Sequence, residues 1–470
     1  MSTIFALSTA YQKSAIAIIR VSGPKAYESA LQITGKASLT PNKATLCILY
    51  NNFYTQKNNN TEKNQKIDEA VVMYFKAPNS YTGEDLVEYH IHGSLAVIKE
   101  LLELLYTKDE HKMAERGEFT KRALINGKVD ILKAESINDL INAETKQQQK
   151  QAIFSMLGGA HSVYKNYEEQ IKEILALSET TIDFSDQDID DDLFTYINNK
   201  LENLITSIDK NITNLAGVQK LKQGISIAIL GEPNVGKSSL INFLTKQNIA
   251  IVSPIAGTTR DVIESNIDFH GFAINIADTA GLRENTTDII EQEGIKRAKE
   301  KIANADIKII MLDVSNINNT SIEILNYIDE NSIVLVNKLD IFANNLNNTN
   351  YKQISKDFLQ NNANQKLNTQ NTVIASINSN TGLDVFSNIL IQKLHNITKI
   401  LENPVITQQR HQQIMNQVLL ELKNAQSVKT EIVLCAFHLR SALTHLGAIT
   451  GKTNIEDILD IIFSKFCIGK

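Results

Sequence analysis

The chain has 470 residues, of which 43% are hydrophobic and 21% charged, the ordinary composition of a globular protein. This length exceeds one ordinary core and predicts about two to four domains. The formal net charge of -6 excludes a chain that is basic throughout, so a nucleic-acid partner would have to meet a local basic patch. Three cysteines occur, far apart and without a C-x-x-C pair, which argues against a disulfide framework and a structural zinc site.

The start of the chain, MSTIFALSTAYQKSAIAIIR, lacks the basic stretch and the unbroken apolar stretch of a signal peptide. No apolar run approaches the ~18 residues that a membrane-spanning helix needs. We therefore expect a cytoplasmic protein that does not enter a membrane.

The first 120 residues mix short strand-like runs with helical stretches. Strands are expected at 15–21, 70–75 and 86–91, and the Asn/Gln/Lys-rich segment 51–66 is expected to be a solvated loop. From about residue 121 apolar residues recur at helical spacing, which predicts helices from 131 onward, near 149–181 and near 193–215.

At residue 225 the pattern changes to short apolar strands that alternate with helices. The strands are expected at 225–230, 273–277, 307–312, 333–336 and 373–376, which predicts a parallel sheet covered by helices. The Asn-rich stretch 342–370 is expected to be a loop. After about 385 the chain is predicted to be helical, ending in an apolar stripe that includes Ile462 and Phe466. The simplest geometry inserts the α/β module into one helical domain, with 121–215 packing against 385–470.

A phosphate-binding loop is predicted at 231–238, where GEPNVGKS follows an expected strand and opens a helix. Gly231 and Gly236 allow the backbone to wrap phosphates with its N–H groups, which the helix N-terminus reinforces. Lys237 is expected to reach the β and γ phosphates, and Ser238 to ligate Mg²⁺.

Three further motifs complete a guanine-nucleotide site. The sequence DTAG at 278–281 closes a strand and places the carboxylate of Asp278 beside the metal. Between it and the phosphate loop lies GTTRD at 257–261, where Thr259 would supply a second Mg²⁺ hydroxyl. The sequence NKLD at 337–340 ends a later strand, and the carboxylate of Asp340 can accept both the N1–H and the amino group of guanine. The base is therefore predicted to be guanine.

The expected catalytic glutamine is missing. In Ras-like switches a Gln directly after the D-x-x-G motif orients the attacking water, and this position is Leu282. Either hydrolysis is very slow, or another group acts on the water. Arg260 and Arg283 are nearby, but neither is an obvious arginine finger.

Motifs over almost the whole chain resemble the tRNA-modifying GTPase family MnmE, also called TrmE. They are GEPNVGKSSLIN, IAGTTRD and DTAGLR in the module, NSYTGEDLVE and GEFTKRALINGKVDI before it, and the terminal CIGK. The resemblance implies an α/β plus α fold. Its predicted parts are a tetrahydrofolate-binding-like dimerisation domain over 1–120, a discontinuous helical domain over 121–220 and 385–470, and an inserted Ras-like P-loop GTPase domain with a mainly parallel sheet over 221–384.

The resemblance also implies a replacement for the missing glutamine. In this family K⁺ lies against the phosphates and supplies positive charge where negative charge develops. The implied K⁺ ligands are Asn234, Ser253, Ile255 and Thr258. The water-orienting acid maps to Glu291, with Glu293 as a rival because one extra residue follows DTAGLR. Activation in the family pairs two GTPase modules face to face.

The nucleotide and cation contacts expected from the motifs and the resemblance are as follows: Asn234, Val235, Gly236, Lys237, Ser238, Ser239, Ser253, Ile255, Thr258, Thr259, Asp278, Thr279, Ala280, Gly281, Asn337, Lys338 and Asp340. The family's further base-contacting loop is degenerate here, because NSNTG at 378–382 replaces the usual S-A before T-G. A backbone N–H there can still serve the guanine O6.

The resemblance implies a one-carbon folate site, for 5-formyltetrahydrofolate or a related folate, in the N-terminal domain. Its contacts map to Arg20, Glu88 and Lys128, with Lys470 reaching in from the C-terminus. A carboxylate can pair with the pterin amino and N3 groups, whereas Arg and Lys suit an anionic glutamate tail. Two positions depart from the family pattern, YQKSA at 11–15 and Arg116 before G-E-F, and neither departure removes a ligand.

Several residues allow two interpretations. Cys467 is either catalytic beside the folate or a small apolar residue that ends the Ile/Phe stripe. His90 and His92 share one strand face as a possible metal pair, but without an acidic partner nearby a sheet-surface position is favoured. The acidic run 186–192 lacks the Gly and Glu of a calcium loop and is expected to be a solvated loop.

The resemblance implies a potassium-stimulated GTPase that hydrolyses GTP and modifies carbon 5 of the wobble uridine (U34) of certain tRNAs by a carboxymethylaminomethyl-type addition. The implied partners are a second copy in a homodimer, tRNA, and a flavin-dependent (FAD) MnmG-type protein in a heterotetramer. The alternative is an RNA-binding ribosome-assembly GTPase switch, against which stand the acidic total charge and the missing KH-type G-x-x-G loop. A membrane-remodelling GTPase would need a basic amphipathic segment, and none is evident.

Overall fold

The computed structural model describes residues 2–51, 65–183, 191–247, 249–250, 264–278, 299–315, 322–342, 371–398, 406–428, 431–451, 459, 462–463 and 466–469. The chain forms two compact units. The first consists of Met1–Ile141, Ser155–Asp188 and Ser427–Lys470, and the second of Asn142–Phe154 and Ile189–Gln426.

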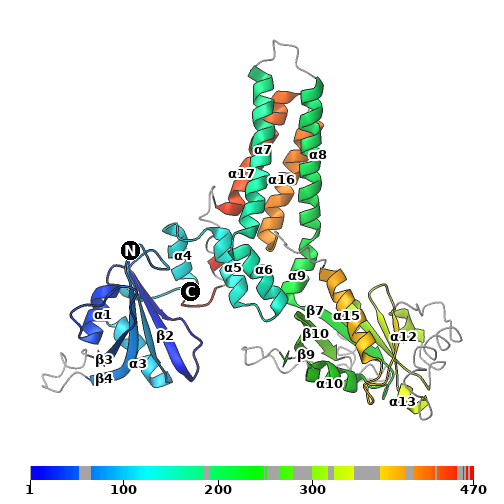
Figure 1. Cartoon of the computed structure of the whole chain (residues 1–470), viewed down its shortest axis with the longest axis horizontal. Helices are drawn as coiled ribbons and strands as arrows, with labels where there is room; N and C mark the ends of the chain where they lie inside the picture. Colours follow the sequence, from blue (N-terminus) through cyan, green and yellow to red (C-terminus); the bar gives the residue numbers. More distant parts are fainter. Residues whose placement is uncertain are drawn as a thin grey trace, which may run out of the picture. The chain divides into compact units, whose positions relative to one another are not determined.

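The first unit contains a six-stranded sheet in the order β3-β4-β5-β2-β1-β6 (Figure 1). Its strands are β1 (Thr3–Leu7), β2 (Ser14–Ser22), β3 (Thr45–Asn51), β4 (Gln65–Phe75), β5 (Leu86–Gly93) and β6 (His111–Met113). All neighbours are antiparallel except β1 and β6. The strands predicted at 15–21, 70–75 and 86–91 are confirmed as β2, β4 and β5. Most of the predicted loop 51–66 lies outside the described residues.

One face of this sheet carries the domain core. Alternate residues of β2, such as Ile19 and Val21, are fully buried and pack with residues of α1 (Ala26–Thr34) and α3 (Leu95–Tyr106). Because side chains of a strand alternate between faces, Ile18 and Arg20 lie on the opposite face. This second face is partly exposed, with Ile16 at 60% exposure. The candidate ligands Arg20 and Glu88 therefore lie on the side that α1 and α3 do not cover.

Helices complete the first unit: α4 (Glu118–Ile125), α5 (Ile131–Ile141), α7 (Gly159–Asp183) and α17 (Ile432–Thr450). Helices α7 and α17 run side by side (Figure 1). Among the described residues, α17 is long and apolar enough to span a membrane by length and composition alone, with a mean hydropathy of 1.5 over 18 residues. Polar residues such as Arg440 interrupt its apolar runs, which hid this property in the sequence. Cys435, Leu439 and Leu446 of α17 are buried.

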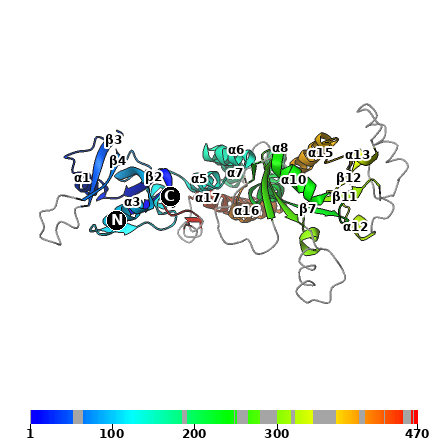
Figure 2. The ribbon, with the colours of Figure 1, turned by 90° about the horizontal axis from the view of Figure 1, so that it is seen from below.

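The second unit contains a seven-stranded sheet in the order β13-β12-β11-β7-β10-β9-β8. Its strands are β7 (Ile225–Gly231), β8 (Ile249–Ala250), β9 (Glu264–Phe269), β10 (Phe272–Asp278), β11 (Ile307–Asp313), β12 (Ile333–Asn337) and β13 (Thr372–Ile374). The five predicted strands are confirmed, and all five run parallel; β7, β11 and β12 lie side by side (Figure 2). The short strands β8 and β9 extend the sheet in antiparallel fashion.

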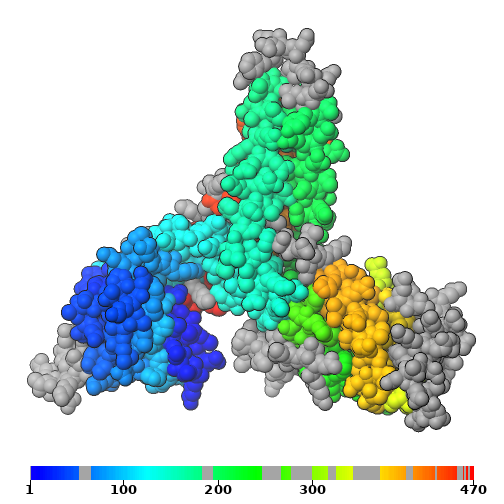
Figure 3. Space-filling view, in the orientation of Figure 1, coloured from blue at the N-terminus to red at the C-terminus, as the bar shows by residue number. Residues whose placement is uncertain are grey.

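The helices of this unit are α6 (Lys146–Met156), α8 (Asp191–Thr213), α9 (Leu215–Gln223), α10 (Lys237–Gln247), α12 (Ile322–Asn326), α13 (Leu339–Phe342), α15 (Leu383–Thr398) and α16 (Gln409–Ser427). Helix α15 buries Phe386, Leu390 and Leu394 in the core of the sheet, and its outer side forms part of the surface (Figure 3). The predicted domain boundary at 384 therefore falls just inside a helix that packs on the sheet.

Helices from before and after the P-loop motif contact each other within each unit, whereas the segments predicted to form a single helical domain are divided between the two units. Helix α7 contacts α17 in the first unit, and α9 contacts α15 in the second. The second contact is close, because a Cβ atom at Gly217 would collide with the carbonyl oxygen of Thr398. The predicted fold class, an α/β plus α chain with a mainly parallel sheet, is confirmed.

Candidate functional site

The phosphate loop connects the end of β7 at Gly231 to the start of α10 at Lys237. Asn234 has a φ of 61° and Gly236 a φ of 107°, both in the left-handed region. A Cβ atom at Gly236 would lie 2.5 Å from Nδ2 of Asn337. Only glycine therefore fits this position, and successive backbone N–H groups can turn toward one anion.

Lys237 lies across this loop. Its Nζ atom donates to the carbonyl oxygens of Gly231 (2.8 Å) and Glu232 (3.0 Å). The ammonium group is therefore held at the loop, within reach of phosphate oxygens that the loop would bind. Ser238 and Ser239 follow in the first turn of α10, and both are exposed.

Asn337 ties the phosphate loop to the loop that follows β13. Its Nδ2 atom donates to the carbonyl oxygen of Val235 (2.8 Å), and its Oδ1 atom accepts from the backbone N–H of Ile377 (3.1 Å). Asn337 and Val235 are both buried. The side chain of Asn337 thus holds the two loops together by hydrogen bonds at the carboxyl edge of the parallel sheet.

Asp340 lies at this edge and is oriented by a residue that the sequence analysis did not single out. The hydroxyl of Ser376 donates to Oδ1 of Asp340 (2.7 Å) and accepts from the backbone N–H of Ser379 (3.2 Å). The base-contacting loop expected at 378–382 begins two residues after Ser376. The sequence did contain a signal for this contact, because Ser376 ends the predicted strand 373–376 and Asp340 closely follows the predicted strand 333–336.

Lys338 has a φ of 69° and forms an ion pair with Asp313 at the end of β11, with 2.7 Å between Nζ and Oδ2. Burial raises the pKa of the Asp313 carboxyl, but hydrogen bonds from Lys338 and Ser315 outweigh it, and the pKa lies below its ordinary value. Asp313 therefore stays ionised at neutral pH and keeps Lys338 at this edge.

Some predicted site residues lie outside the described residues: Ser253, Ile255, Thr258, Thr259, Thr279, Ala280, Gly281, Leu282, Glu291, Glu293 and Lys470. Asp278 is described by its backbone, which pairs with Ile229 of the neighbouring parallel strand β7. This register places Asp278 near Gly231, where the phosphate loop begins. Most of the acidic run 186–192 also lies outside the described residues.

In the N-terminal sheet, Arg20 and Glu88 face each other across β2 and β5. Both Nε (3.0 Å) and Nη2 (2.7 Å) of Arg20 donate to the same oxygen, Oε1 of Glu88. The guanidinium carbon also lies 5.5 Å from the ring centre of Tyr81 and 5.7 Å from that of Phe119. Two aromatic rings and one carboxylate therefore fix Arg20 in place.

Lys128 reaches the same region through the loop that carries Tyr81. A Cβ atom at Gly83 would lie 3.3 Å from Cγ of Lys128, and Nδ2 of Asn126 donates to the carbonyl oxygen of Thr82 (2.7 Å). The structure thus connects Arg20, Glu88 and Lys128 through the segment 81–83.

The C-terminal segment is anchored on this domain. Ile468 forms a backbone bridge with Arg116, and Ser8 donates its hydroxyl to the carbonyl oxygen of Gly469 (3.1 Å). Phe463 and Phe466 pack with Ile131, whereas Cys467 is exposed. The apolar stripe therefore ends at Phe466, and the interpretation of Cys467 as its last packed residue is wrong.

His90 and His92 do have acidic neighbours, contrary to expectation. His90 Nε2 lies 3.4 Å from Oε2 of Glu88, and His92 Nδ1 lies 2.8 Å from Oδ1 of Asp68. The two imidazoles face different carboxylates, and the described part of the chain holds no group of three side chains suited to a metal ion. The sheet-surface position favoured for them agrees with this geometry.

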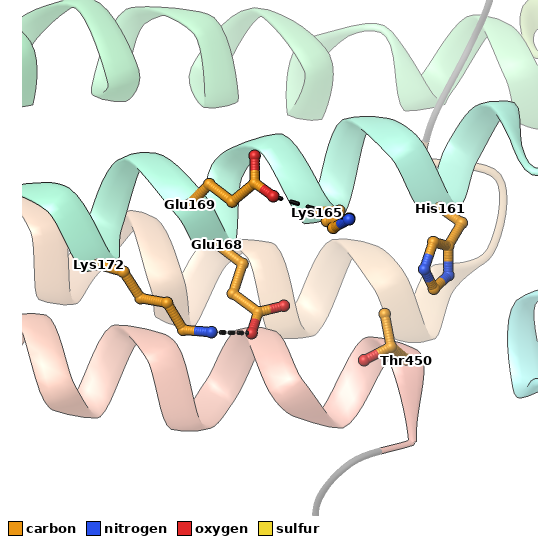
Figure 4. A pocket seen from close by; sticks show the side chains of 6 residues that line it. All are labelled: His161, Lys165, Glu168, Glu169, Lys172 and Thr450. Atoms are coloured by element: carbon orange, nitrogen blue, oxygen red, sulfur yellow. Dashed lines mark hydrogen bonds and ion pairs between the residues drawn. The ribbon is translucent and has the colours of Figure 1, made fainter.

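A hollow of about 250 Å³ is lined by residues of α7 and by Thr450, none of which belongs to either candidate site (Figure 4). Its charged side chains pair within the same helix, Lys172 with Glu168 (2.6 Å) and Lys165 with Glu169 (3.8 Å). The two lysines and two glutamates therefore neutralise one another, and the hollow carries no excess charge from these four residues.

Known proteins resemble the chain over its whole length. The family model described as MnmE helical domain matches residues 131–467, and that described as GTP-binding protein TrmE N-terminus matches residues 3–128. The tRNA modification GTPase MnmE of Rickettsia typhi (strain ATCC VR-144 / Wilmington) is 42% identical over 474 residues, covering 100% of both chains. That of Rickettsia prowazekii (strain Madrid E) is 42% identical over 477 residues, again covering 100% of both.

Among solved structures, the G domain of the T. maritima FeoB iron transporter is 22% identical, with a TM-score of 0.25, and covers 36% of this chain and 98% of its own. The family models and the full-length relatives agree with the motifs at both ends of the chain and with the mainly parallel sheet between them. The chain belongs to the MnmE (TrmE) family of tRNA modification GTPases.

Proposed function

We propose that this chain is a potassium-stimulated GTPase that hydrolyses GTP to GDP and phosphate during modification of carbon 5 of U34 in certain tRNAs. The observation that carries the GTPase part is the Ser376–Asp340 hydrogen bond of 2.7 Å, at the sheet edge that Asn337 ties to the phosphate loop. A carboxylate fixed at this edge can read the N1–H and amino group of guanine while the loop binds the phosphates.

The residues near the phosphate loop suit the two cations. Ser238 presents a hydroxyl at the start of α10, a hard oxygen ligand of the kind Mg²⁺ prefers. Asn234 is exposed in the left-handed conformation and offers an amide oxygen for K⁺. The remaining proposed ligands are Thr259 for Mg²⁺ and Ser253, Ile255 and Thr258 for K⁺. When bound, the cations supply positive charge against the charge that develops on the phosphates.

Within this scheme the protein residues hold and orient the reactants. The backbone N–H groups of the phosphate loop and the Lys237 ammonium bind the phosphate oxygens, and Asp278 supports the Mg²⁺ site. Glu291, or Glu293 in its place, orients the attacking water, because Leu282 has no polar atom to do so. Two GTPase modules are proposed to pair face to face across the cation when the enzyme is activated.

We further propose that 5-formyltetrahydrofolate or a related folate binds at Arg20, Glu88 and Lys128, with Lys470 and Cys467 contributed by the C-terminal segment. The bridge between Arg116 and Ile468 supports this arrangement, because it anchors that segment on the N-terminal domain. The proposed assembly is a homodimer through residues 1–120 that joins an FAD-containing MnmG-type protein in a heterotetramer and acts on tRNA. The proposed domain limits remain 1–120, 121–220, 221–384 and 385–470.

The Asp340→Asn variant tests the identity of the base. The amide of Asn cannot accept from both the N1–H and the amino group of guanine. It can pair with xanthine, which carries an oxygen at C2 in place of the amino group and accepts from the amide N–H. We expect GTP hydrolysis to fall and hydrolysis of xanthosine triphosphate to rise in the full-length variant. Unchanged selectivity for GTP would show that Asp340 does not read the base.

Exchange of KCl for NaCl tests the proposed cation mechanism. Since K⁺ is proposed to act on the transition state, turnover should fall by about tenfold or more, while GTP affinity changes little. Equal turnover in both salts would contradict this mechanism. Mass spectrometry of wobble uridines from cells that lack the protein tests the tRNA reaction separately.

A further inference from the structure

His90 lies beside the proposed folate contact Glu88, on the face of the sheet that α1 and α3 do not cover. Alternation along β5 buries Tyr89 and Ile91 in the core and places Glu88 and His90 on the opposite face. Nε2 of His90 is buried and makes no hydrogen bond in the part of the chain that the structure describes. It lies 3.4 Å from Oε2 of Glu88, so a short movement brings the two atoms into hydrogen-bond contact.

The two carboxylate oxygens of Glu88 accept different numbers of hydrogen bonds. An ionised carboxylate has about four lone-pair positions, two on each oxygen. Two nitrogen atoms of Arg20 occupy Oε1. If His90 takes one position on Oε2, one position is left for a ligand. A ligand N–H group therefore meets Glu88 at the oxygen that His90 faces, and bidentate pairing with a pterin would require Arg20 to move.

We propose that His90 is a positioning residue, whose imidazole donates from Nε2 to Oε2 of Glu88 and fixes the carboxylate for one N–H donor of a planar heterocycle. This inference rests on the proposed folate site. The ion pair with Arg20 sets the charge balance of Glu88, whereas His90 sets the direction in which its second oxygen points. The heterocycle recognised in this way carries a ring or amino N–H at its edge and no net charge there.

His92 provides a matched control on the same strand and the same face. Its Nδ1 and its backbone N–H both meet Asp68, at 2.8 Å each, and its side chain is 71% exposed. Removing this imidazole changes a sheet-surface histidine without touching Glu88.

Calorimetric titration of the full-length chain with 5-formyltetrahydrofolate tests the proposal, with thermal unfolding of each variant as a check of folding. His90→Leu should weaken binding about tenfold, the usual effect of losing a hydrogen bond to a charged group. His90→Gln keeps a donor and should remain within about threefold of the wild type. His92→Leu should bind as the wild type does.

The double variant Glu88→Gln/His90→Leu separates positioning from general packing. If His90 acts through Glu88, the double variant should bind no more weakly than Glu88→Gln alone. Additive losses, or equal losses in His90→Leu and His90→Gln, would overturn the role of His90. If the wild type binds the folate and Glu88→Gln does not, while His90→Leu is unaffected, the role of His90 is wrong and the folate site stands. If the folded wild type does not bind the folate, the proposed site itself is wrong.

Discussion

The two candidate sites are built in different ways. The phosphate loop depends on main-chain geometry, since Gly236 has no space for a side chain and Asn337 binds a carbonyl oxygen and a backbone N–H. The N-terminal site depends on charged side chains from different strands, with Arg20 and Glu88 paired across the sheet. Steric changes should therefore damage the first site most, and changes of charge the second.

The largest expected effect is that of Gly236→Ala. The added methyl group would lie 2.5 Å from the Asn337 amide at a φ of 107°, so the loop must deform. We expect GTP affinity to fall by more than about 100-fold, or roughly 3 kcal/mol, in a nucleotide titration. Gly158→Ala is the control, because its φ of 93° is also positive but no atom lies within 4 Å of its Cβ position. A tolerated Gly236→Ala would contradict the main-chain account of this site.

Glu118→Gln tests how far a charged cluster next to the N-terminal sheet contributes to the stability of that domain. Glu118 accepts from Arg122 (3.0 Å) and lies 3.1 Å from Lys112, and Arg122 is only 6% exposed. Burial raises the pKa of Glu118, but hydrogen bonds from the Glu115 backbone, Arg122 and Lys112 outweigh it, so the pKa lies below 4.5. Arg122 keeps its ion pair with Glu84 (3.0 Å) but loses its second carboxylate partner, which should cost about 1–3 kcal/mol at pH 7.

The pH dependence of this loss has a definite sign. A carboxyl whose pKa is lower in the folded state than in the unfolded state stabilises the folded state at any pH above the unfolded-state pKa. This stabilisation disappears as the pH falls through the folded-state pKa. Amide hydrogen exchange in β1 and α4 should therefore be faster in Glu118→Gln at pH 7, and the difference should shrink below pH 4.5. Glu103→Gln, at an exposed position, should change nothing. A difference that persists in acid would show that charge is not its cause.

The smallest expected effect is that of Ser376→Ala. Without the hydroxyl, Asp340 loses one hydrogen bond but keeps its charge, so GDP affinity should fall about fivefold, or roughly 1 kcal/mol. Ser379→Ala is a suitable control, because its hydroxyl meets Thr381 and not Asp340. An unchanged affinity in Ser376→Ala would mean that the backbone alone orients Asp340.

Local patterns predicted much of the fold. The strands of the parallel sheet are buried on both faces and form continuous apolar runs, which the sequence displays directly. Strand β9 escaped prediction because Glu264, Asn266 and Asp268 alternate with only two buried apolar residues, Ile267 and Phe269. The sequence signal for β9 is the pair His270-Gly271, which forms the two-residue turn to β10 and has positive φ at both residues.

The candidate sites also differ in how much of them a local sequence pattern could predict. The phosphate loop is one contiguous motif, so its position followed from the sequence. Arg20 and Glu88 are 68 residues apart, and no local pattern pairs them; the family resemblance supplied both. Ser376 and Asp340 are 36 residues apart and meet because β12 and β13 are neighbours, a register that spacing alone does not determine.

The missing side chain at Gly217 has a consequence for how the P-loop module is attached. Helices α9 and α15, through which the chain enters and leaves this module, touch where the Gly217 backbone meets the carbonyl of Thr398. A module whose two ends are neighbours can be excised, transplanted or re-joined at new termini without stretching its fold. The absence of a side chain at Gly217 therefore lets the two ends of this module lie next to each other.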